Sequence, residues 1–320
     1  TIAEFRRING KALKAANREF VVLCKELELL GGETIGIDGA FFNASASDAS
    51  ITTKKQLEVD LRQIERAIDS YDQLIDDNDA QEGRNGVLFA DDPKLDEKLE
   101  ALKQRQARKQ AQLKHLQDSG ETQRSRTDPD ARSLSKGKQH TVGYNVQSTL
   151  DDKHKLIIHH EVTNAGNDSQ QLSRQCTAAM EILGVDAIDA VADAGYYSEA
   201  ELAACEAAGV TVYVPIPDKH QALNRQGRIS GEHFHYHSSV DVYVCPGGGE
   251  LLHPRGKPQE KNGVLRTRYT RPASHCQGCP LQAVCLSKPD SPRSVYRSEH
   301  AELVAAHRQR MEEQGTERMR

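Results

Sequence analysis

Two short strings, well over a hundred residues apart, constrain the fold of this chain most. Ile37-Asp38-Gly39-Ala40 and Val191-Ala192-Asp193-Ala194-Gly195 each end a run of β-branched and small residues, and a glycine lies within two residues of each aspartate. Such runs are typical of interior strands. A strand-end aspartate near a glycine is also ordinary turn chemistry. Only the two strings together favour a split pair of carboxylates that binds metal.

The composition restricts the class of protein. The chain has 320 residues, of which 37% are hydrophobic and 28% charged, as expected of a globular protein with one large core or two smaller ones. No apolar run approaches the roughly 18 residues of a membrane span, and no signal peptide is recognisable. We therefore expect a cytoplasmic protein that has no membrane partner.

The formal net charge of −5 is unevenly distributed. Residues 56–100 hold fourteen acidic and five basic residues, whereas residues 101–140 hold four acidic and ten basic ones. Residues 257–320 hold seven acidic and twelve basic residues. Two basic regions, Lys103 to Lys138 and Lys257 to Arg320, are therefore available for phosphates. Because charge runs are usually solvated faces, this pattern permits a nucleic-acid partner without requiring one.

Helical periodicity dominates the first part of the chain. The first 30 residues predict a helix that ends at Gly31-Gly32. Its apolar face comprises Phe5, Ile8, Ala12, Ala15, Ala16, Phe20, Leu23, Leu27 and Leu30.

A pair of heptad patterns follows the first strand, residues 34–42. The first seam comprises Leu57, Leu61, Ile64, Ile68, Tyr71 and Ile75, and the second comprises Leu95, Leu99, Leu102, Leu113 and Leu116, with polar Gln106 and Lys109 at its centre. Gly83-Arg84-Asn85-Gly86 supplies a turn between them. The pattern predicts an antiparallel helical hairpin.

Strand patterns begin near Thr127. We expect strands over 140–150 and 155–162, a helix over 169–183, a strand that ends at Asp193, a helix over 198–208 and a strand over 210–216. Asp168 is expected to cap the first of these helices, with Gln171 at the capping-box position. This is the element order of an α/β, ribonuclease-H-like mixed sheet, in which the first and fourth strands lie side by side. Asp38 and Asp193 then meet.

The seven cysteines fall into two groups. Cys24, Cys176 and Cys205 lie among apolar neighbours on predicted helices and are interpreted as buried small hydrophobes. Cys245, Cys276, Cys279 and Cys285 include one C-x2-C pair, which is the spacing of a zinc knuckle, and His275 is a substitute ligand. A structural zinc and four free thiols both remain open.

The ordered motifs resemble the insertion-sequence DDE transposases, specifically the subgroup with a helical insertion after the first aspartate and a cysteine cluster. The strings that carry the resemblance are Gly36-Ile37-Asp38-Gly39, Asp128-Pro129-Asp130-Ala131-Arg132, Gly143-Tyr144-Asn145-Val146-Gln147, Val162-Thr163-Asn164 with Asn167-Asp168, Ala192-Asp193-Ala194-Gly195-Tyr196-Tyr197, Tyr213-Val214-Pro215, and Cys276 through Cys285. Each string is weak alone, whereas their order is specific.

The resemblance implies a two-metal chemistry on DNA. Two Mg²⁺ ions about 3.5–4 Å apart would polarise the scissile phosphate, activate the nucleophile and stabilise the leaving oxygen. By resemblance, Asp38 bridges both ions and Asp193 holds one of them. The implied partners are double-stranded DNA and a second copy of the chain in a homodimer, in a bacterial, nucleoid-associated setting.

The family's third ligand is a glutamate on a later helix, followed by Phe-Gly and a lysine. Glu299, Glu302, Glu312, Glu313 and Glu317 lie in or after the last predicted helix, residues 298–314, and none has that context. We therefore expect that the chain is truncated before the catalytic glutamate. In that case it should bind DNA weakly and fail in strand transfer.

The expected organisation has five parts. Residues 1–33 are the end of an N-terminal DNA-binding region, 34–49 and 127–218 the transposase core, 50–126 the hairpin insertion, 219–295 a small Cys-rich subdomain, and 296–320 a truncated C-terminal helix. Two alternatives remain: a catalytically dead DNA-binding and dimerising remnant, and a ribonuclease-H-like nuclease with Glu313 as its third ligand.

Overall fold

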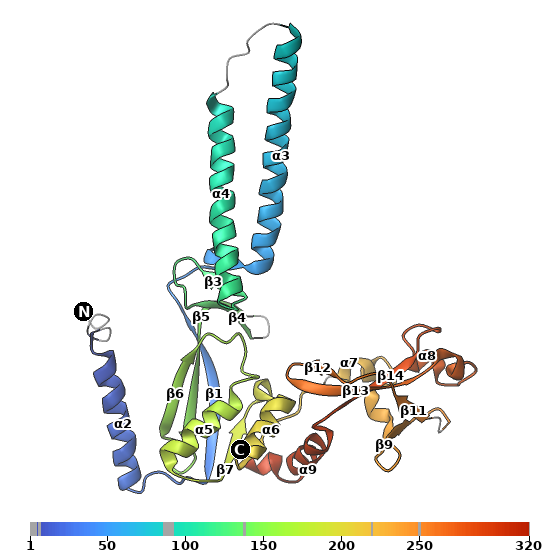
Figure 1. The fold of residues 1–320 in the computed structure, drawn as a ribbon. Helices are drawn as coiled ribbons and strands as arrows, with labels where there is room; N and C mark the ends of the chain where they lie inside the picture. The colour runs from blue at the N-terminus through green and yellow to red at the C-terminus, as the bar shows by residue number, and fades with distance from the viewer. Residues whose placement is uncertain are drawn as a thin grey trace. The chain divides into compact units, whose positions relative to one another are not determined.

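A computed structural model describes residues 5, 8–85, 93–136, 139–218, 220–248 and 251–319. The chain divides into two compact units, each with helices and strands (Figure 1). The first unit comprises residues 1–39, 147–161 and 168–320, and the second comprises residues 40–146 and 162–167. None of the helices in the described ranges is both long and apolar enough to span a bilayer.

The first unit is built on a mixed sheet. Its strands are β1 (Thr34–Asn43), β5 (Gln139–Asp151), β6 (Ile157–Thr163), β7 (Ile188–Ala192) and β8 (Val210–Tyr213). β1 lies between β5 and β7, β8 lies beyond β7, and β6 pairs with β5. β1, β7 and β8 run parallel, with Ile37 opposite Ala192. The expected adjacency of the first strand and the Asp193 strand is therefore confirmed.

Two helices contribute to the apolar core on this sheet, α5 (Leu172–Leu183) and α6 (Glu199–Ala207) (Figure 1). Along β7, buried and half-buried residues alternate, as the period of two in a strand requires. The core includes Ile35, Ile37, Ile188, Ala190, Ala192, Val210, Val212, Leu172, Cys176, Leu183, Leu202 and Cys205. Cys24, Cys176 and Cys205 are all buried, which confirms their interpretation as small hydrophobes.

A second sheet follows in the same unit. It comprises β9 (His235–His237), β10 (Val242–Val244), β11 (Leu251–Pro254), β12 (Gln259–Lys261), β13 (Val264–Arg271) and β14 (Arg293–Ser298). The order is β12-β13-β11-β10-β9, with β14 paired to β13. Phe234, Tyr243, Leu252, Tyr269, Cys285 and Val295 form its core. This segment therefore has a hydrophobic cluster separate from that of the first sheet.

The remaining helices of the first unit are α2 (Gly10–Glu26), α7 (Gln221–Arg225), α8 (Gln282–Cys285) and α9 (Ala301–Arg318). Short 3-10 turns are η2 (Ala194–Tyr196), η3 (Gly231–His233) and η4 (Ala273–Cys276).

The predicted apolar face of the N-terminal helix was wrong. Phe20 and Leu27 are more than half exposed, whereas Val21 and Cys24 are buried. Apolar residues occupy two overlapping stripes of this helix, and tertiary packing covers the stripe of Val21 and Cys24. Sequence periodicity alone does not distinguish the two stripes.

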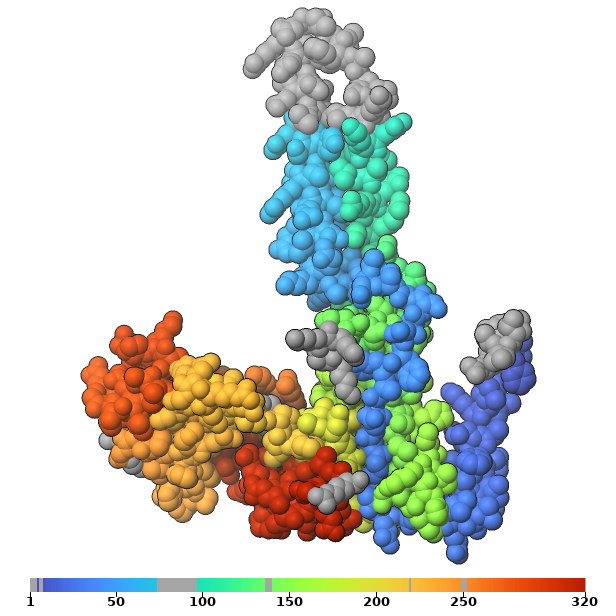
Figure 2. Space-filling view, turned by 180° about the vertical axis from the view of Figure 1, so that it is seen from behind, coloured from blue at the N-terminus to red at the C-terminus, as the bar shows by residue number. Residues whose placement is uncertain are grey.

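The second unit consists largely of a helical hairpin. α3 (Lys54–Asn85) and α4 (Pro93–Asp118) pack side by side over much of their length (Figure 2), as predicted. Leu57, Ile64, Leu99 and Leu116 of the expected seams are buried. The strands of this unit are β2 (Ile51–Thr53), paired with β3 (Gln123–Ser125) after the turn η1 (Asp48–Ser50), and β4 (Arg132–Lys136), paired with the first residues of β5.

The polar centre of the second heptad has a specific partner. Lys109 Nζ lies 2.6 Å from Asp60 Oδ2 on α3. The hydrogen bond from Lys109 lowers the pKa of Asp60. Lys109 therefore interrupts the apolar seam with an ion pair between the two helices.

The predicted turn at Gly83-Arg84-Asn85-Gly86 was wrong in part. α3 continues through Asn85, and Gly86 lies outside the described residues. The side chains of Ile75 and Leu95, two expected seam positions, also lie outside the described set. The sequence prediction ended the helix too early, because a glycine such as Gly83 is tolerated inside a helix at a cost of only about 1 kcal/mol.

Candidate functional site

The two predicted aspartates stand at the same edge of the sheet. β1 and β7 are parallel neighbours, and Ile37 is paired with Ala192. Asp38 follows Ile37 within β1, which continues to Asn43, whereas Asp193 is the first residue after β7, and both aspartates are exposed. The carboxyl ends of parallel strands are the usual place for a binding site in an α/β sheet.

Each aspartate also accepts a hydrogen bond from the backbone of a nearby glycine. The backbone N–H of Gly39 donates to Asp38 Oδ1 at 2.8 Å, and that of Gly195 donates to Asp193 Oδ1 at 2.8 Å. Asp193 is the N-cap of η2. The turn interpretation is therefore confirmed for Asp193 and wrong for Asp38, because β1 continues through Asp38 to Asn43. Both glycine contacts orient the carboxylates without burying them.

Tyr196 lies beneath this edge. Its side chain is completely buried, and its hydroxyl donates to Gln147 Oε1 on β5. Burial raises the pKa of Tyr196, and the negative charges of Asp168, Asp38 and Asp193 raise it further. The hydroxyl of Tyr196 therefore lies within the electrostatic field of three carboxylates.

The third carboxylate, Asp168, was missed by sequence reasoning, which assigned it as a helix N-cap. That assignment was wrong: α5 begins at Leu172, its N-cap is Gln171, and the N–H of Gln171 donates to the backbone oxygen of Asp168. The chain makes an additional turn before the helix begins. Asp168 is only 6% exposed, and its Oδ1 accepts a hydrogen bond of 2.7 Å from Gln147 Nε2.

The signal that could have identified Asp168 was its place in one of the ordered motif strings, Asn167-Asp168. Local capping chemistry offered a sufficient explanation for an aspartate before a helix. Only the packing of β5 against β1 brings Gln147 to it.

The chemistry of the exposed pair suits a hard divalent cation. Carboxylate oxygens are the ligands that Mg²⁺ prefers in proteins, and Asp38 and Asp193 are accessible to solvent. Within the described ranges, no group of three or more His, Cys, Asp or Glu side chains has an arrangement able to hold a metal ion. The geometry therefore provides a pair of candidate ligands.

Glu313, considered from sequence as a third ligand, is not brought to this pair. It is exposed and accepts a hydrogen bond of 2.9 Å from Gln309 on the same helix. The adjacent Gln314 accepts from Tyr213 on β8, and Arg318 lies 3.1 Å from Asp189 near the amino end of β7. Glu313 forms no group with Asp38 and Asp193 that could hold a metal ion among the described residues.

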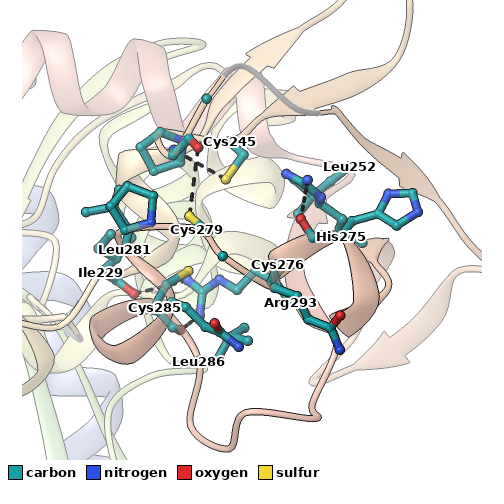
Figure 3. Close-up of a pocket in the computed structure, with 18 residues that line it drawn as sticks. Ile229, Cys245, Leu252, His275, Cys276, Cys279, Leu281, Cys285, Leu286 and Arg293 are labelled. Carbon is teal, nitrogen blue, oxygen red and sulfur yellow. Dashed lines mark hydrogen bonds between the residues drawn. The ribbon is translucent and has the colours of Figure 1, made fainter.

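The four cysteines of the second group line one cavity of about 260 Å³, at the end of β10 and in the segment from η4 to α8 (Figure 3). A Cβ placed on Gly247 would lie 2.8 Å from Cys279 Sγ and 3.8 Å from Cys245 Sγ. Burial raises the pKa of the Cys276 and Cys285 thiols, and the neighbouring thiols raise it further. The cysteines thus cluster, but in the described structure they do not form the expected tetrahedral metal site.

Two further motif strings have structural roles in the second unit. The hydroxyl of Tyr144 donates to Asp128 Oδ2 at 2.5 Å, which raises the pKa of Tyr144 to about 12. A Cβ on Gly143 would lie 1.8 Å from the backbone oxygen of Phe42. Gly143 is therefore required by the close approach of two backbones.

One known protein family matches part of the chain. A family model described as "Transposase DDE domain" matches residues 115–275, which is half of the chain. No curated protein and no solved structure matches. The matched segment includes Asp193 and the strings around Tyr144 and Asp168, while Asp38 precedes it.

Proposed function

The chain belongs to the transposase DDE domain family, and from that membership we propose that it cuts and joins double-stranded DNA at the ends of an insertion sequence. The observation that carries the proposal is the register of β1 and β7, which puts Asp38 and Asp193 on neighbouring strands at one sheet edge. The proposed cofactor is Mg²⁺, held by these two residues.

The proposed fold is ribonuclease-H-like, with a helical hairpin inserted after the first aspartate. It is supported by the order of β5, β1, β7 and β8 in the sheet and by α3 and α4 between β1 and β5. We also keep the subgroup with a cysteine cluster as a proposal, because Cys245 and the three later cysteines line one cavity.

The chain's own residues would orient the reaction. Asp38 and Asp193 would hold the cation with their exposed carboxylates, each braced by a glycine N–H. When bound, Mg²⁺ supplies positive charge that polarises the scissile phosphate and favours deprotonation of the attacking hydroxyl. The buried Tyr196 and the apolar core beneath it keep the sheet edge fixed, which matters because a misplacement of about 1 Å can cost on the order of a hundredfold in rate.

DNA contact would come from exposed cations. In the segment from β11 to β13, Arg255, Lys257 and Lys261 are exposed. Other basic residues of the predicted region have internal partners: Arg266 pairs with Glu199, and Arg297 stacks on Tyr236 at 3.7 Å. The proposed phosphate contacts are therefore a subset of those predicted from charge counts.

The test uses the whole chain, Mg²⁺ or Mn²⁺, and duplex DNA that carries the inverted repeats flanking its coding sequence, with random duplex for comparison. Asp38→Asn and Asp193→Asn should each reduce cleavage at least about a hundredfold, because metal-assisted stabilisation contributes several kcal/mol. Asp189→Asn is the matched control, since Asp189 lies on the same strand β7 and pairs with Arg318 instead.

The products distinguish the alternatives. Cleavage and joining that depend on both aspartates support the transposase. Binding to DNA without cleavage in wild type would indicate a dead remnant, and cleavage without joining would indicate a nuclease. Cleavage that persists in Asp38→Asn and Asp193→Asn would refute the proposed ligands.

Zinc in the cysteine cavity is a separate proposal. It is supported by the sulfur atoms of Cys245 and Cys279, which lie 3.8 Å and 2.8 Å from the position that a Cβ on Gly247 would take. Metal analysis of purified protein should find about one zinc per chain, with zinc–sulfur bonds of about 2.3 Å by X-ray absorption. Protein without zinc that keeps its fold would show that these are four free thiols.

A further inference from the structure

Three buried polar side chains, those of Tyr196, Gln147 and Asp168, are joined by hydrogen bonds. The hydroxyl of Tyr196, just after β7, donates to Gln147 Oε1 on β5, and Gln147 Nε2 donates to Asp168 Oδ1 at 2.7 Å. Tyr196 and Gln147 are completely buried, and Asp168 is 6% exposed. Polar groups this deep are costly unless they are hydrogen-bonded, so their presence calls for an explanation.

The two oxygens of Asp168 lie near the two glycines that follow the proposed ligands. A Cβ on Gly39, the residue after Asp38 in β1, would lie 2.8 Å from Asp168 Oδ1 and 2.6 Å from Gln147 Nε2. A Cβ on Gly195, two residues after Asp193, would lie 3.8 Å from Asp168 Oδ2. Asp168 therefore lies between the middle of β1 and the turn after β7.

The carboxylate of Asp168 adds a negative charge next to the pair formed by Asp38 and Asp193. The affinity of a site for a divalent cation rises with the negative charge gathered around it. An apolar residue of similar volume would fill the same space without this effect.

We propose that Asp168 is a positioning residue of the metal site: through Gln147 and Tyr196 it fixes the part of β1 that presents Asp38 and the turn after β7 that presents Asp193, and its charge strengthens cation binding. This inference rests on the proposed function. It assigns Asp168 no direct bond to the metal.

The experiment measures Mn²⁺ binding to the whole chain by titration calorimetry, without DNA. Asp168→Asn keeps the shape of the side chain and removes its charge, and it should weaken Mn²⁺ binding about 10–100-fold, the usual effect of losing a residue that supports metal ligands. Tyr196→Phe, which removes the hydrogen bond to Gln147, should weaken it about tenfold.

Asp151→Asn is the matched control. Asp151 is a completely buried carboxylate and the last residue of β5, and it accepts hydrogen bonds from the backbone N–H groups of Gly31, Gly32 and Lys153, each at 3.0 Å. This variant should lower the thermal stability of the protein and leave Mn²⁺ affinity unchanged. A purely structural role for Asp168 predicts the same result for Asp168→Asn.

The outcomes separate the two proposals. If Asp38→Asn binds Mn²⁺ as well as wild type does, no metal site exists at this pair, and both proposals fail. If Asp38→Asn abolishes binding while Asp168→Asn binds with wild-type affinity, only the positioning role of Asp168 is refuted. Weakened binding in Asp168→Asn, with unchanged binding in Asp151→Asn, supports it.

Discussion

Gly39→Ala tests how closely the buried network packs under β1. The added Cβ would lie 2.6 Å from Gln147 Nε2, 2.8 Å from Asp168 Oδ1 and 3.1 Å from the hydroxyl of Tyr196. The first two separations are shorter than a carbon atom tolerates, so the polar groups must move. Each of them is the end of a side chain that is buried and already hydrogen-bonded.

The expected change in the free energy of unfolding caused by Gly39→Ala is the sum of opposing contributions. Overpacking costs about 1–3 kcal/mol, and loss of a buried hydrogen bond costs about 1–3 kcal/mol. Replacing a strand glycine with alanine returns about 0.5–1 kcal/mol of backbone entropy. A net destabilisation of about 2 kcal/mol is therefore expected, which corresponds to roughly a 30-fold change in the opening equilibrium.

Hydrogen exchange by mass spectrometry is the appropriate assay, because it reports the opening of one sheet in a chain with two units. Peptides that cover β1 and β7 should exchange about 30-fold faster in Gly39→Ala. Gly36→Ala is the control: it lies on the same strand, and nothing stands within 4 Å of its added Cβ. Equal protection in Gly39→Ala, Gly36→Ala and wild type would refute the packing argument.

Three further outcomes are expected. Gly143→Ala should unfold the β4–β5 region and give insoluble protein, since its Cβ would lie 1.8 Å from the backbone oxygen of Phe42; a soluble variant with wild-type exchange would contradict this. The double variant Lys257→Gln, Lys261→Gln should lower the slope of log affinity against log salt by about 2 for any duplex, and an unchanged slope in filter binding would exclude these phosphate contacts. Burial lowers the pKa of His307, whose Nε2 lies 2.8 Å from the backbone oxygen of Val214. The stability contributed by neutral His307 is complete above its unfolded pKa of about 6.5 and declines as the pH falls below that value. The melting temperature of His307→Gln should therefore fall less between pH 7 and pH 5 than that of wild type.

The sequence predicted strands and helices correctly where the spacing of apolar residues within one element determines its type. The runs before Asp38 and Asp193 predicted interior strands, and the heptads predicted the hairpin of α3 and α4, because both depend on the period of apolar residues. The structure confirms these elements. By contrast, the N-terminal helix has two apolar stripes, and only packing selected that of Val21 and Cys24.

The candidate site divides in the same way. The sequence predicted that Asp38 and Asp193 each follow the apolar part of an interior strand, since a β-branched run followed by Asp needs no distant partner to be recognised; β1, however, continues beyond Asp38 to Asn43. Only the tertiary structure placed Asp168 next to Gly39 and Gly195, because its partner Gln147 lies on β5, 21 residues earlier in the chain. A helix N-cap is a local feature that can be recognised in the sequence. A buried hydrogen bond between two elements depends instead on how those elements pack. An aspartate shortly before a helix is compatible with either role.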